Sequence, residues 1–502
     1  MESAEHAWIG DQITLEFDSK EGAGAAKGLP LDIGPGALTY GQCIALGGDF
    51  YGVVGQPIST SANPEGAFMD AFGTLRTKWD QVAPILAILA EEIAAVEQAL
   101  KDGKEPSTAY ARLGDTLSYR WNVVTGGGSN ISDLWPMGRY LALAAENWDH
   151  FTHFAVAAYR AGHAVAMREA GAAGQANVSP PEKRARLEHA YAMNAFADHF
   201  LTDLFSAGHM RAPRKELYDQ VTTPVPGYSG SLGSLLTRCM HDEDSVHGLN
   251  VADKSGNAWL AYGDKRLLDS VSAANRTRVT GAVQASAVDV WKAYTGGPQE
   301  HLYQALNWIP DLDRVQDVTT KANFSPLFLM QSDVAARRND VENRQDYSWT
   351  DSWWGWSTYA LLIGTHAYEH AKCYDFSTKE FLGWLGVVGK NYVSVEKEEK
   401  DAHGCRWVFD ANKLYLRKQT SGSADRDLGE GWSGYADWGL GGNFYAPVLY
   451  NEDLTISLQD EPTRKLFLDD DLHQVRWSDK GNPSPPRLLR VELPLRAPSM
   501  SC

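Results

Sequence analysis

The sequence contains few cysteines, and no two of them are close neighbours. The five residues are odd in number and widely separated: Cys43, Cys239, Cys373, Cys405 and Cys502. Thiolate zinc sites use cysteines in closely spaced pairs, and disulfide-stabilised scaffolds use many paired cysteines. The sequence of this 502-residue chain therefore suggests neither a thiolate zinc site nor a disulfide-stabilised scaffold.

Net positive charge is also missing. The chain has 46 Lys and Arg against 64 Asp and Glu, which gives a formal net charge of −18 at pH 7. Proteins that hold nucleic acid or anionic lipid over a broad surface need a basic face. The charge balance argues against such a surface, and we expect no nucleic-acid partner. It leaves open a metal site acting on a phosphate, because bound cations dominate the local field.

No long apolar segment is present either. The longest, such as VAPILAILAEEIAAV at residues 82–96, is interrupted by charges before the roughly 20 residues that cross a bilayer. The first twenty residues lack the basic start and apolar stretch of a secretory signal. We expect a soluble protein that can touch a membrane only peripherally. Export would need a specialised route or a signal already removed.

Helical patterns fill most of residues 64–310. Apolar residues recur at helical spacing within 68–103, 135–174 and 274–297, and Ser179 before two prolines marks another helix start. Beyond about residue 375 the segments become short and β-branched or aromatic, which is typical of strands. Five such segments are 391–400, 405–411, 413–419, 454–460 and 488–495.

These patterns predict a mainly α fold with a smaller β-rich C-terminal domain. We expect a helical domain at residues 1–340, a junction at 341–385 and a β-rich domain at 386–502.

One helical segment, HAYAMNAFADHFLTDLFSAGHMR at residues 189–211, carries unusual polar residues among alanines and aromatics. His199 and Asp203 are four apart and share one helix face, whereas His209 lies six residues further on and faces elsewhere. One helix could thus give two ligands to one metal and a third to a neighbouring metal. Imidazole and carboxylate ligands suit zinc. The alternative is that these residues are helix-surface groups or hydrogen-bonded core groups.

Four further residues stand in comparable settings along the chain. His6 lies in EHAWIGDQI, Asp49 in ALGGDFYG, His150 in ENWDHF inside an apolar helical pattern, and His241 in CMHDEDSVHG.

Together these segments resemble the zinc-dependent phospholipase C family and the related zinc nucleases that cleave single-stranded nucleic acid. HFLTDLFSAGH resembles the central motif His–x3–Asp–x5–His of that family, and the other segments follow in the order of its ligands. The resemblance covers about residues 1–270. It implies an all-helical fold that holds two or three zinc ions.

The resemblance also implies a role for each residue. One zinc would be bound by Asp49, His150, His199 and Asp203. His6 and Asp203 would bind a second zinc, with the Asp203 carboxylate bridging the pair. His209, His241 and an acidic residue after His241 would bind the third.

Three acidic residues directly follow His241. Asp244 at i+3 shares its helix face and is preferred, with Asp242 or Glu243 as alternatives if the segment is not helical. Main-chain groups of an N-terminal residue bind zinc in this family. We hypothesise that Met1, five residues before His6, plays this part.

The expected function is phospholipase C activity, in which a glycerophospholipid such as phosphatidylcholine is cleaved to diacylglycerol and a phosphorylated headgroup. Asp49 is the candidate general base. The first alternative is a single-strand nuclease or nucleotidase with the same metals, and the second is a binding protein without zinc. His366 and His370 in THAYEH are four apart, but no third ligand is evident, and we interpret them as structural or exposed.

Overall fold

The computed structural model of the chain shows two compact units. The first comprises Met1–Asn339 and Gln345–Gly355, and the second comprises Asp340–Arg344 and Trp356–Leu495. The residues that it describes are 1–18, 23–113, 116–128, 137–223, 229–297, 303–341, 343–365, 372–378, 381–388, 392–397, 406–410, 415–419, 426–427, 429–430, 436–437, 448–451, 455–469, 474–478 and 487–492.

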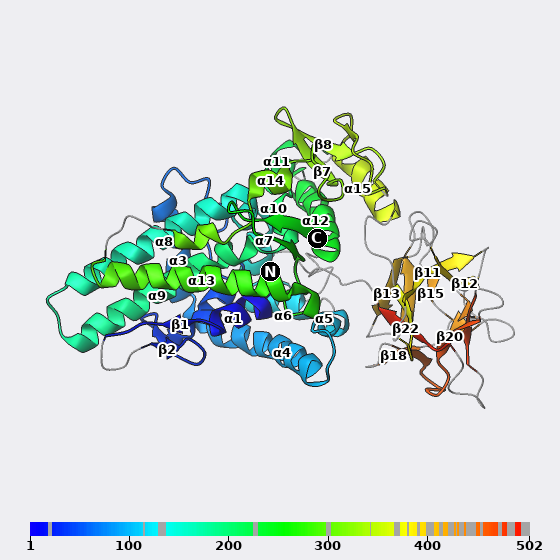
Figure 1. Cartoon of the computed structure of the whole chain (residues 1–502), viewed down its shortest axis with the longest axis horizontal. Helices are drawn as coiled ribbons and strands as arrows, with labels where there is room; N and C mark the ends of the chain where they lie inside the picture. The colour runs from blue at the N-terminus through cyan, green and yellow to red at the C-terminus, as the bar shows by residue number, and fades with distance from the viewer. Residues whose placement is uncertain are drawn as a thin grey trace. The chain divides into compact units, whose positions relative to one another are not determined.

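The first unit is built mainly from helices (Figure 1). Its α-helices are α1 Ser3–Asp11, α2 Tyr40–Leu46, α3 Pro64–Thr77, α4 Val82–Lys101, α5 Ser107–Leu113, α6 Thr116–Val124, α7 Arg139–Ala145, α8 Thr152–Gln175, α9 Pro180–Asp203, α10 Ala207–Met210, α11 Arg214–Gln220, α12 Ser229–His247, α13 Ala273–Tyr294 and α14 Leu312–Gln316. Short 3-10 turns are η1 Trp79–Gln81, η3 Trp148–His150, η4 Ser270–Ser272 and η5 Gln304–Asn307.

Helices α8, α9 and α13 form the centre of this unit (Figure 1). Helix α9 is buried on every side from Ala190 to Asp203, since α2, α8 and α13 all pack against it. Its alanines let the neighbours come close: a Cβ added at Gly162 of α8 would lie 2.6 Å from the Cβ of Ala197. Close packing of this kind fixes the position of the last turn of α9.

Local sequence signals set several helix starts. Asn63 accepts a hydrogen bond from the Gly66 N–H and is followed by Pro64, which suits a first helical position. Thr39 and Gln42 form a reciprocal capping box at the start of α2. Helix α9 begins at Pro180, directly after Ser179, as predicted.

The predicted helix over 135–174 is interrupted, because α7 and α8 are separated by the η3 turn that contains His150. The carboxylate of Asp149 accepts hydrogen bonds from the backbone N–H groups of Ile58 (2.5 Å) and Ser59 (2.9 Å), which ties the turn to another loop. Thr152 then has a φ of 52°, a conformation that a β-branched residue rarely adopts. His150 therefore lies in a turn rather than inside a helix.

The strands of the first unit form short antiparallel pairs and one three-stranded sheet. The hairpin of β5 Leu249–Ala252 and β6 Ala258–Ala261 follows α12 directly. The others are β1 Thr14–Leu15 with β2 Gly24–Ala25, β3 Leu31–Asp32 with β4 Ala37–Leu38, and β7 Phe328–Gln331, β8 Val334–Arg338 and β9 Trp349–Thr350 in order.

The second unit contains α15 Gly355–Thr365, which begins at the last residue of the first unit, and antiparallel strands. Its largest sheet has the order β16-β17-β12-β11-β10-β22, with β21 paired to β12 and β20 paired to β21. The strands are β10 Lys372–Asp375, β11 Phe381–Val388, β12 Tyr392–Glu396, β13 Arg406–Asp410, β14 Tyr415–Gln419, β15 Arg426–Asp427, β16 Gly429–Glu430, β17 Ala436–Asp437, β18 Val448–Tyr450, β19 Ile456–Leu458, β20 Leu466–Asp469, β21 Gln474–Trp477 and β22 Leu489–Glu492.

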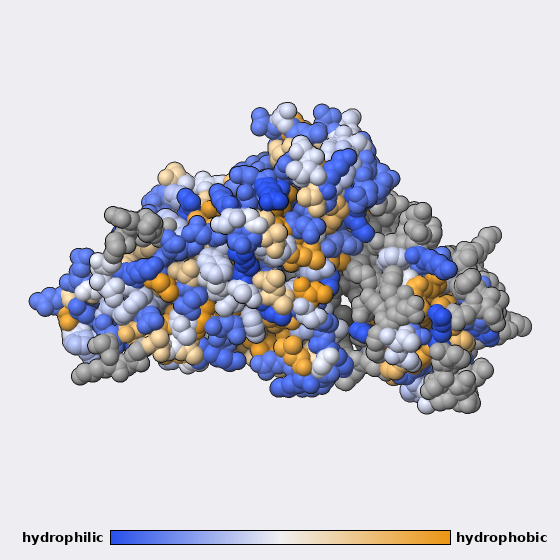
Figure 2. Space-filling view, in the orientation of Figure 1, coloured by the Kyte–Doolittle hydropathy of each residue, from blue (hydrophilic) through white to orange (hydrophobic). Residues whose placement is uncertain are grey.

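The mainly α fold with a β-rich C-terminal part is thus as the sequence predicts. The chain passes from the first unit to the second after Gly355, inside the segment predicted as a junction. Hydrophilic residues cover much of the visible face of the first unit, with apolar side chains scattered among them (Figure 2). Among the described helices, none is both long and apolar enough to span a membrane.

Candidate metal centre

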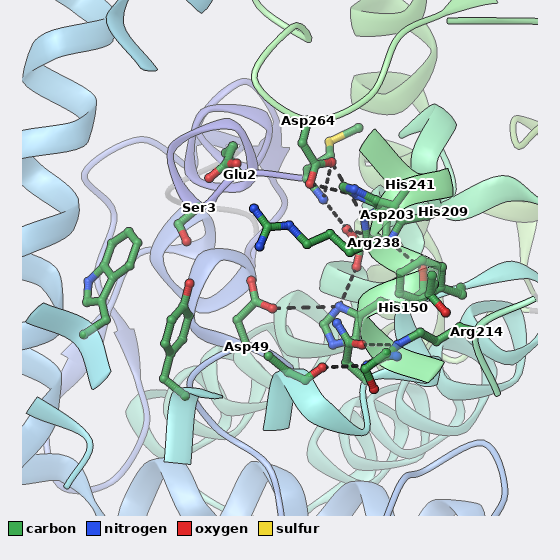
Figure 3. Close-up of a pocket in the computed structure, with 18 residues that line it drawn as sticks. Glu2, Ser3, Asp49, His150, Asp203, His209, Arg214, Arg238, His241 and Asp264 are labelled. Carbon is green, nitrogen blue, oxygen red and sulfur yellow. Dashed lines mark hydrogen bonds and ion pairs between the residues drawn. The ribbon is translucent and has the colours of Figure 1, made fainter. Parts of the chain in front are cut away.

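Histidine and aspartate side chains from six separate elements line one pocket of the first unit (Figure 3): Asp49, His150, Asp203, His209, His241 and Asp264. They come from the turn after α2, the η3 turn, the last turn of α9, α10, α12 and the loop after β6, and His6 of α1 and His199 of α9 lie next to them. Three groups have ligand atoms within 4.8 Å of one another: His6, Asp49 and His199; His150, His199 and Asp203; and His209, His241 and Asp264. Each of these groups could hold a metal ion.

Asp203 lies between the groups and faces them with different oxygens. Its Oδ2 is 2.8 Å from His150 Nδ1 and 3.6 Å from His199 Nε2. Its Oδ1 is 3.5 Å from His6 Nε2 and 2.5 Å from the Met1 amino nitrogen. A carboxylate with two oxygens directed to separate neighbours can bridge two cations, which a neutral imidazole cannot do.

The distances between the ligand atoms within each group fit the binding of one shared metal ion. Two ligand atoms that are each about 2.1 Å from a tetrahedral ion are roughly 3.4 Å apart. His199 Nε2 lies 3.1 Å from His150 Nδ1, and Asp49 oxygens lie 4.0 Å from both nitrogens. In the third group His241 Nε2 is 3.2 Å from Asp264 Oδ2, and His209 Nε2 is 3.6 Å from Asp264 Oδ1.

Hydrogen bonds fix how the imidazoles point. His199 Nδ1 donates to the Ile44 carbonyl (2.8 Å), and His209 Nδ1 donates to the His150 carbonyl (2.9 Å). Because a neutral imidazole carries one N–H, these bonds leave the Nε2 lone pair for a metal. The Ile44 carbonyl is one of the last of α2, where carbonyls lack partners within the helix.

His6 is oriented through a hydroxyl group. The Thr202 Oγ1–H donates to the carbonyls of Asp198 and His199, so its oxygen accepts the hydrogen bond from His6 Nδ1 at 2.8 Å. His6 Nε2 and His209 Nε2 are buried and have no hydrogen-bond partner. Buried polar atoms are normally satisfied, and a bound cation would satisfy both.

Charges in the centre are strongly coupled. Burial alone would raise the pKa of Asp203, but the Met1 amino group and three histidines, His209, His199 and His150, hold it well below its usual range. Burial alone would lower the pKa of that amino group, but Asp203 and Asp264 raise it to about 12. Without a metal ion, the carboxylates of Asp203 and Asp264 are thus balanced by the Met1 amino group and by protonated neighbours, and a bound cation could take over this role.

The histidines have different protonation preferences. Burial, together with the Met1 amino group, lowers the pKa of His6 to about 4, and burial holds that of His199 well below its usual range. Both are thus neutral at physiological pH, which is the form that binds metals. Burial would lower the pKa of His241 as well, but Asp264 and Asp242 raise it to about 10.

A glycine turn makes room for these imidazoles. Gly48 has a φ of 67°, and a Cβ there would lie 2.6 Å from His199 Cδ2 and 2.8 Å from His150 Cε1. Only glycine fits both the backbone conformation and the space. This glycine turn also places Asp49, whose side chain is 27% exposed, at the edge of the pocket.

The structure does not bring the expected Asp244 to the centre. Its two oxygens pair with Arg211 Nη2 (2.7 Å) and Nε (2.9 Å), so this side chain is held away by a bidentate ion pair. Glu243 likewise pairs with Arg338 (2.8 Å), and Asp242 accepts a hydrogen bond from His241 Nδ1 (3.0 Å). None of the three acidic residues completes the third group.

Asp264, which sequence reasoning missed, takes that place. It lies after the β5–β6 hairpin, 23 residues beyond His241, where no helical spacing relates the two. Glu5 of α1 accepts hydrogen bonds from the N–H groups of Lys265 (3.1 Å) and Leu267 (2.8 Å), which holds the loop in place. The available signal was the Gly263–Asp264 pair, which repeats the Gly–Asp order of the Asp49 turn.

The other seven expected ligands, His6, Asp49, His150, His199, Asp203, His209 and His241, belong to the groups described above. His366 and His370 lie outside the described residues. The pocket above the groups has a volume of about 100 Å³, and Trp121 and Tyr140 form an aromatic wall on one side of it.

Comparisons with known proteins add no family assignment. No protein-family model matches the chain, and neither curated proteins nor solved structures give a significant match. Inference about function therefore depends on the chemistry of this pocket.

Proposed function

We propose that this protein is a zinc-dependent phosphodiesterase of the phospholipase C type. In this proposal it cleaves a glycerophospholipid to diacylglycerol and a phosphorylated headgroup. The observation that carries it is Asp203, a buried carboxylate whose Oδ2 faces His150 and whose Oδ1 faces His6 and the Met1 amino group. A centre of several cations around one bridging carboxylate suits the cleavage of a phosphodiester.

The donor set favours zinc over harder ions. Imidazole nitrogens predominate over carboxylate oxygens, and this mixture suits zinc better than magnesium or calcium. We assign Asp49, His150, His199 and Asp203 to one ion and His6 with Asp203 to a second. His209, His241 and Asp264 hold a third, and the Met1 amino group lies beside Asp203 (2.5 Å) and Asp264 (3.2 Å).

When bound, zinc would neutralise the phosphate and lower the pKa of a coordinated water toward 7. Asp49 reaches the pocket from the edge, and burial raises the pKa of its carboxyl to about 6. We assign Asp49 to orient the attacking water and take its proton, with attack at phosphorus in line with the diacylglycerol oxygen. Trp121 and Tyr140 then cover the apolar part of the substrate and exclude water.

A nuclease or nucleotidase is the second candidate, and the same aromatic wall favours it. Trp121 and Tyr140 line the pocket and could stack a nucleobase, as aromatic residues do in single-strand binding.

The first test is the metal content of the purified chain by plasma mass spectrometry, with Asp203→Asn in parallel. We expect two or three zinc ions per chain and a loss of at least two in the variant, since Asp203 faces two groups. Lack of stoichiometric metal in the wild type would refute the proposal.

The second test measures turnover by the zinc-loaded chain. Diacylglycerol release from phosphatidylcholine and phosphatidylserine is compared with cleavage of single-stranded DNA. Cleavage of DNA alone would select the nuclease.

A further inference from the structure

Beside the metal groups the pocket contains one charged side chain that reaches it from α12. Arg238 lines the pocket, and its side chain is 20% exposed, whereas Arg214 in the same lining is 1% exposed. Arg214 donates to the carbonyls of Ala144 and Ala145 and holds the end of α7. Figure 3 shows the Arg238 side chain extending into the pocket, with its guanidinium directed away from His241.

Arg238 belongs to a polar stripe along one face of α12. Ser234, Thr237, Arg238 and His241 all line the pocket, and their spacing puts them on the same face. His241 lies three positions after Arg238 in the helix, which corresponds to about 4.5 Å along the axis. A phosphate held beside His241 would therefore place its headgroup, a few bond lengths from phosphorus, against Arg238.

Arg238 forms an ion pair along α12. Its Nε lies 3.5 Å from Asp242 Oδ2, and Asp242 also accepts the hydrogen bond from His241 Nδ1. Guanidinium groups bind carboxylates and phosphates through paired N–H donors and repel ammonium groups. The remaining acidic lining residue outside the metal groups, Glu2, lies 3.7 Å from Lys265 Nζ and is almost fully buried.

We propose that Arg238 binds a second anionic group on the substrate headgroup. This inference rests on the proposed function and narrows its substrate class to glycerophospholipids whose headgroup carries a carboxylate or a further phosphate. Phosphatidylserine is the test case, and phosphatidylethanolamine is its matched control because the two headgroups differ by one carboxylate.

The experiment uses the zinc-loaded full chain on both lipids in neutral detergent micelles at equal surface concentration. We expect the wild type to show a kcat/KM at least about 10-fold higher for phosphatidylserine. Arg238→Gln should lower kcat/KM for phosphatidylserine by about 10- to 100-fold, as for loss of a charge-assisted hydrogen bond, and leave phosphatidylethanolamine within about 3-fold. Arg168→Gln, which removes an exposed charge from α8, should keep the wild-type preference.

Binding supplies a readout that does not need turnover. Isothermal titration of O-phosphoserine and phosphoethanolamine should show about 10-fold tighter binding of phosphoserine to the wild type and no preference in Arg238→Gln. The zinc content of the variant should equal that of the wild type.

Equal kcat/KM for both lipids in the wild type would overturn the inference, and so would an equal loss on both in Arg238→Gln. The second result would place Arg238 on the scissile phosphate or in support of His241. Hydrolysis of neither of these lipids nor of phosphatidylcholine by zinc-loaded protein would refute the proposed function itself, and the titration would then decide the anion site alone.

Discussion

Single residues decide how this centre is built, and Asp203 is the clearest case. It ends α9, is almost fully buried, and contacts the Met1 amino group and His150 with different oxygens. An unpaired carboxylate in such a place would be costly, so its partners must supply positive charge. The same demand applies to Asp264, whose pKa is held well below its usual range by the Met1 amino group and His241 against the effect of burial.

The metal content of two variants can distinguish the expected roles of Asp264 and Asp244. We expect Asp264→Asn to lose one zinc ion per chain, because an amide gives a poor ligand at the position beside His209 and His241. Asp244→Asn should keep the full zinc content, although loss of the ion pair with Arg211 destabilises the fold by about 3 kcal/mol or more. Metal content per folded protein, measured after gel filtration, checks both. Retention of all zinc by Asp264→Asn would contradict the assignment.

The Gly48 turn gives a second prediction at this scale. Gly48→Ala adds a Cβ that meets both His199 and His150, so zinc affinity should fall by at least about tenfold. Gly55→Ala is the matched control, since Gly55 has a similar φ of 77° and nothing within 4 Å of the added Cβ. Both variants should lose about 1 kcal/mol of stability through backbone strain. Equal zinc affinity in the two, from competition with a chelating dye, would show that the steric argument is wrong.

Residues that share a helix or a motif could be predicted from the sequence, and those joined only by the fold could not. His199, Asp203 and His209 stand out because polar groups interrupt an apolar helix. Asp264 is brought to His241 by a hairpin, and Asp244 is withdrawn by Arg211, 33 residues earlier in the chain. Neither event leaves a periodic pattern in the sequence. Helical spacing alone therefore favours Asp244, whereas the structure places Asp264 beside His241.

At the scale of elements, α9 has to be held in register because it carries His199 and Asp203 of the candidate metal groups. Asp198 does this from inside the core, where it accepts hydrogen bonds from Tyr40 of α2 (2.6 Å) and Ser286 of α13 (2.7 Å). The break between α7 and α8 also positions a residue of the candidate centre, because it turns His150 toward α9. The sequence pattern predicted the helices but not the break, because the bonds that Asp149 makes to the loop at residues 58–59 are tertiary.

The contact between α1 and α4 predicts a pH effect. Glu92 of α4 accepts a hydrogen bond from the Ala4 N–H (3.2 Å) at the start of α1, and burial raises its pKa to about 8 from 4.5. Between pH 4.5 and about 8, the folded chain thus holds a proton on Glu92 that the unfolded chain has released. The stability that protonated Glu92 contributes is complete below pH 4.5 and is lost as the pH rises through about 8.

In the Glu92→Gln variant residue 92 cannot ionise, so the variant does not lose this stability as the pH rises. Relative to the wild type, the variant should gain on the order of 1–3 kcal/mol of unfolding free energy between pH 5.5 and pH 8.5. Urea unfolding at the two pH values measures it, with Glu97→Gln at an exposed position of α4 as the control. A difference between variant and wild type that does not change with pH would contradict the prediction.

At the scale of the whole molecule, the two units have separate hydrophobic cores. The larger core contains residues between Met1 and Val315, and the smaller one contains residues between Cys373 and Val491. All the candidate metal groups described above belong to the first unit. Zinc should therefore stabilise one unit and leave the other unchanged.

Calorimetry of the zinc-loaded chain should accordingly show two unfolding transitions. A chelator should lower the midpoint of one by several degrees, because an ion at 1,000 times its Kd adds about 4 kcal/mol to the stability of the unit that binds it. The other transition should not move, since its core includes no residue of the metal groups. A chain ending at Gly355 assigns the transitions: it should keep the chelator-sensitive one and its full zinc content. A single transition that moves as a whole, or loss of zinc on truncation, would show that the two units depend on each other for folding.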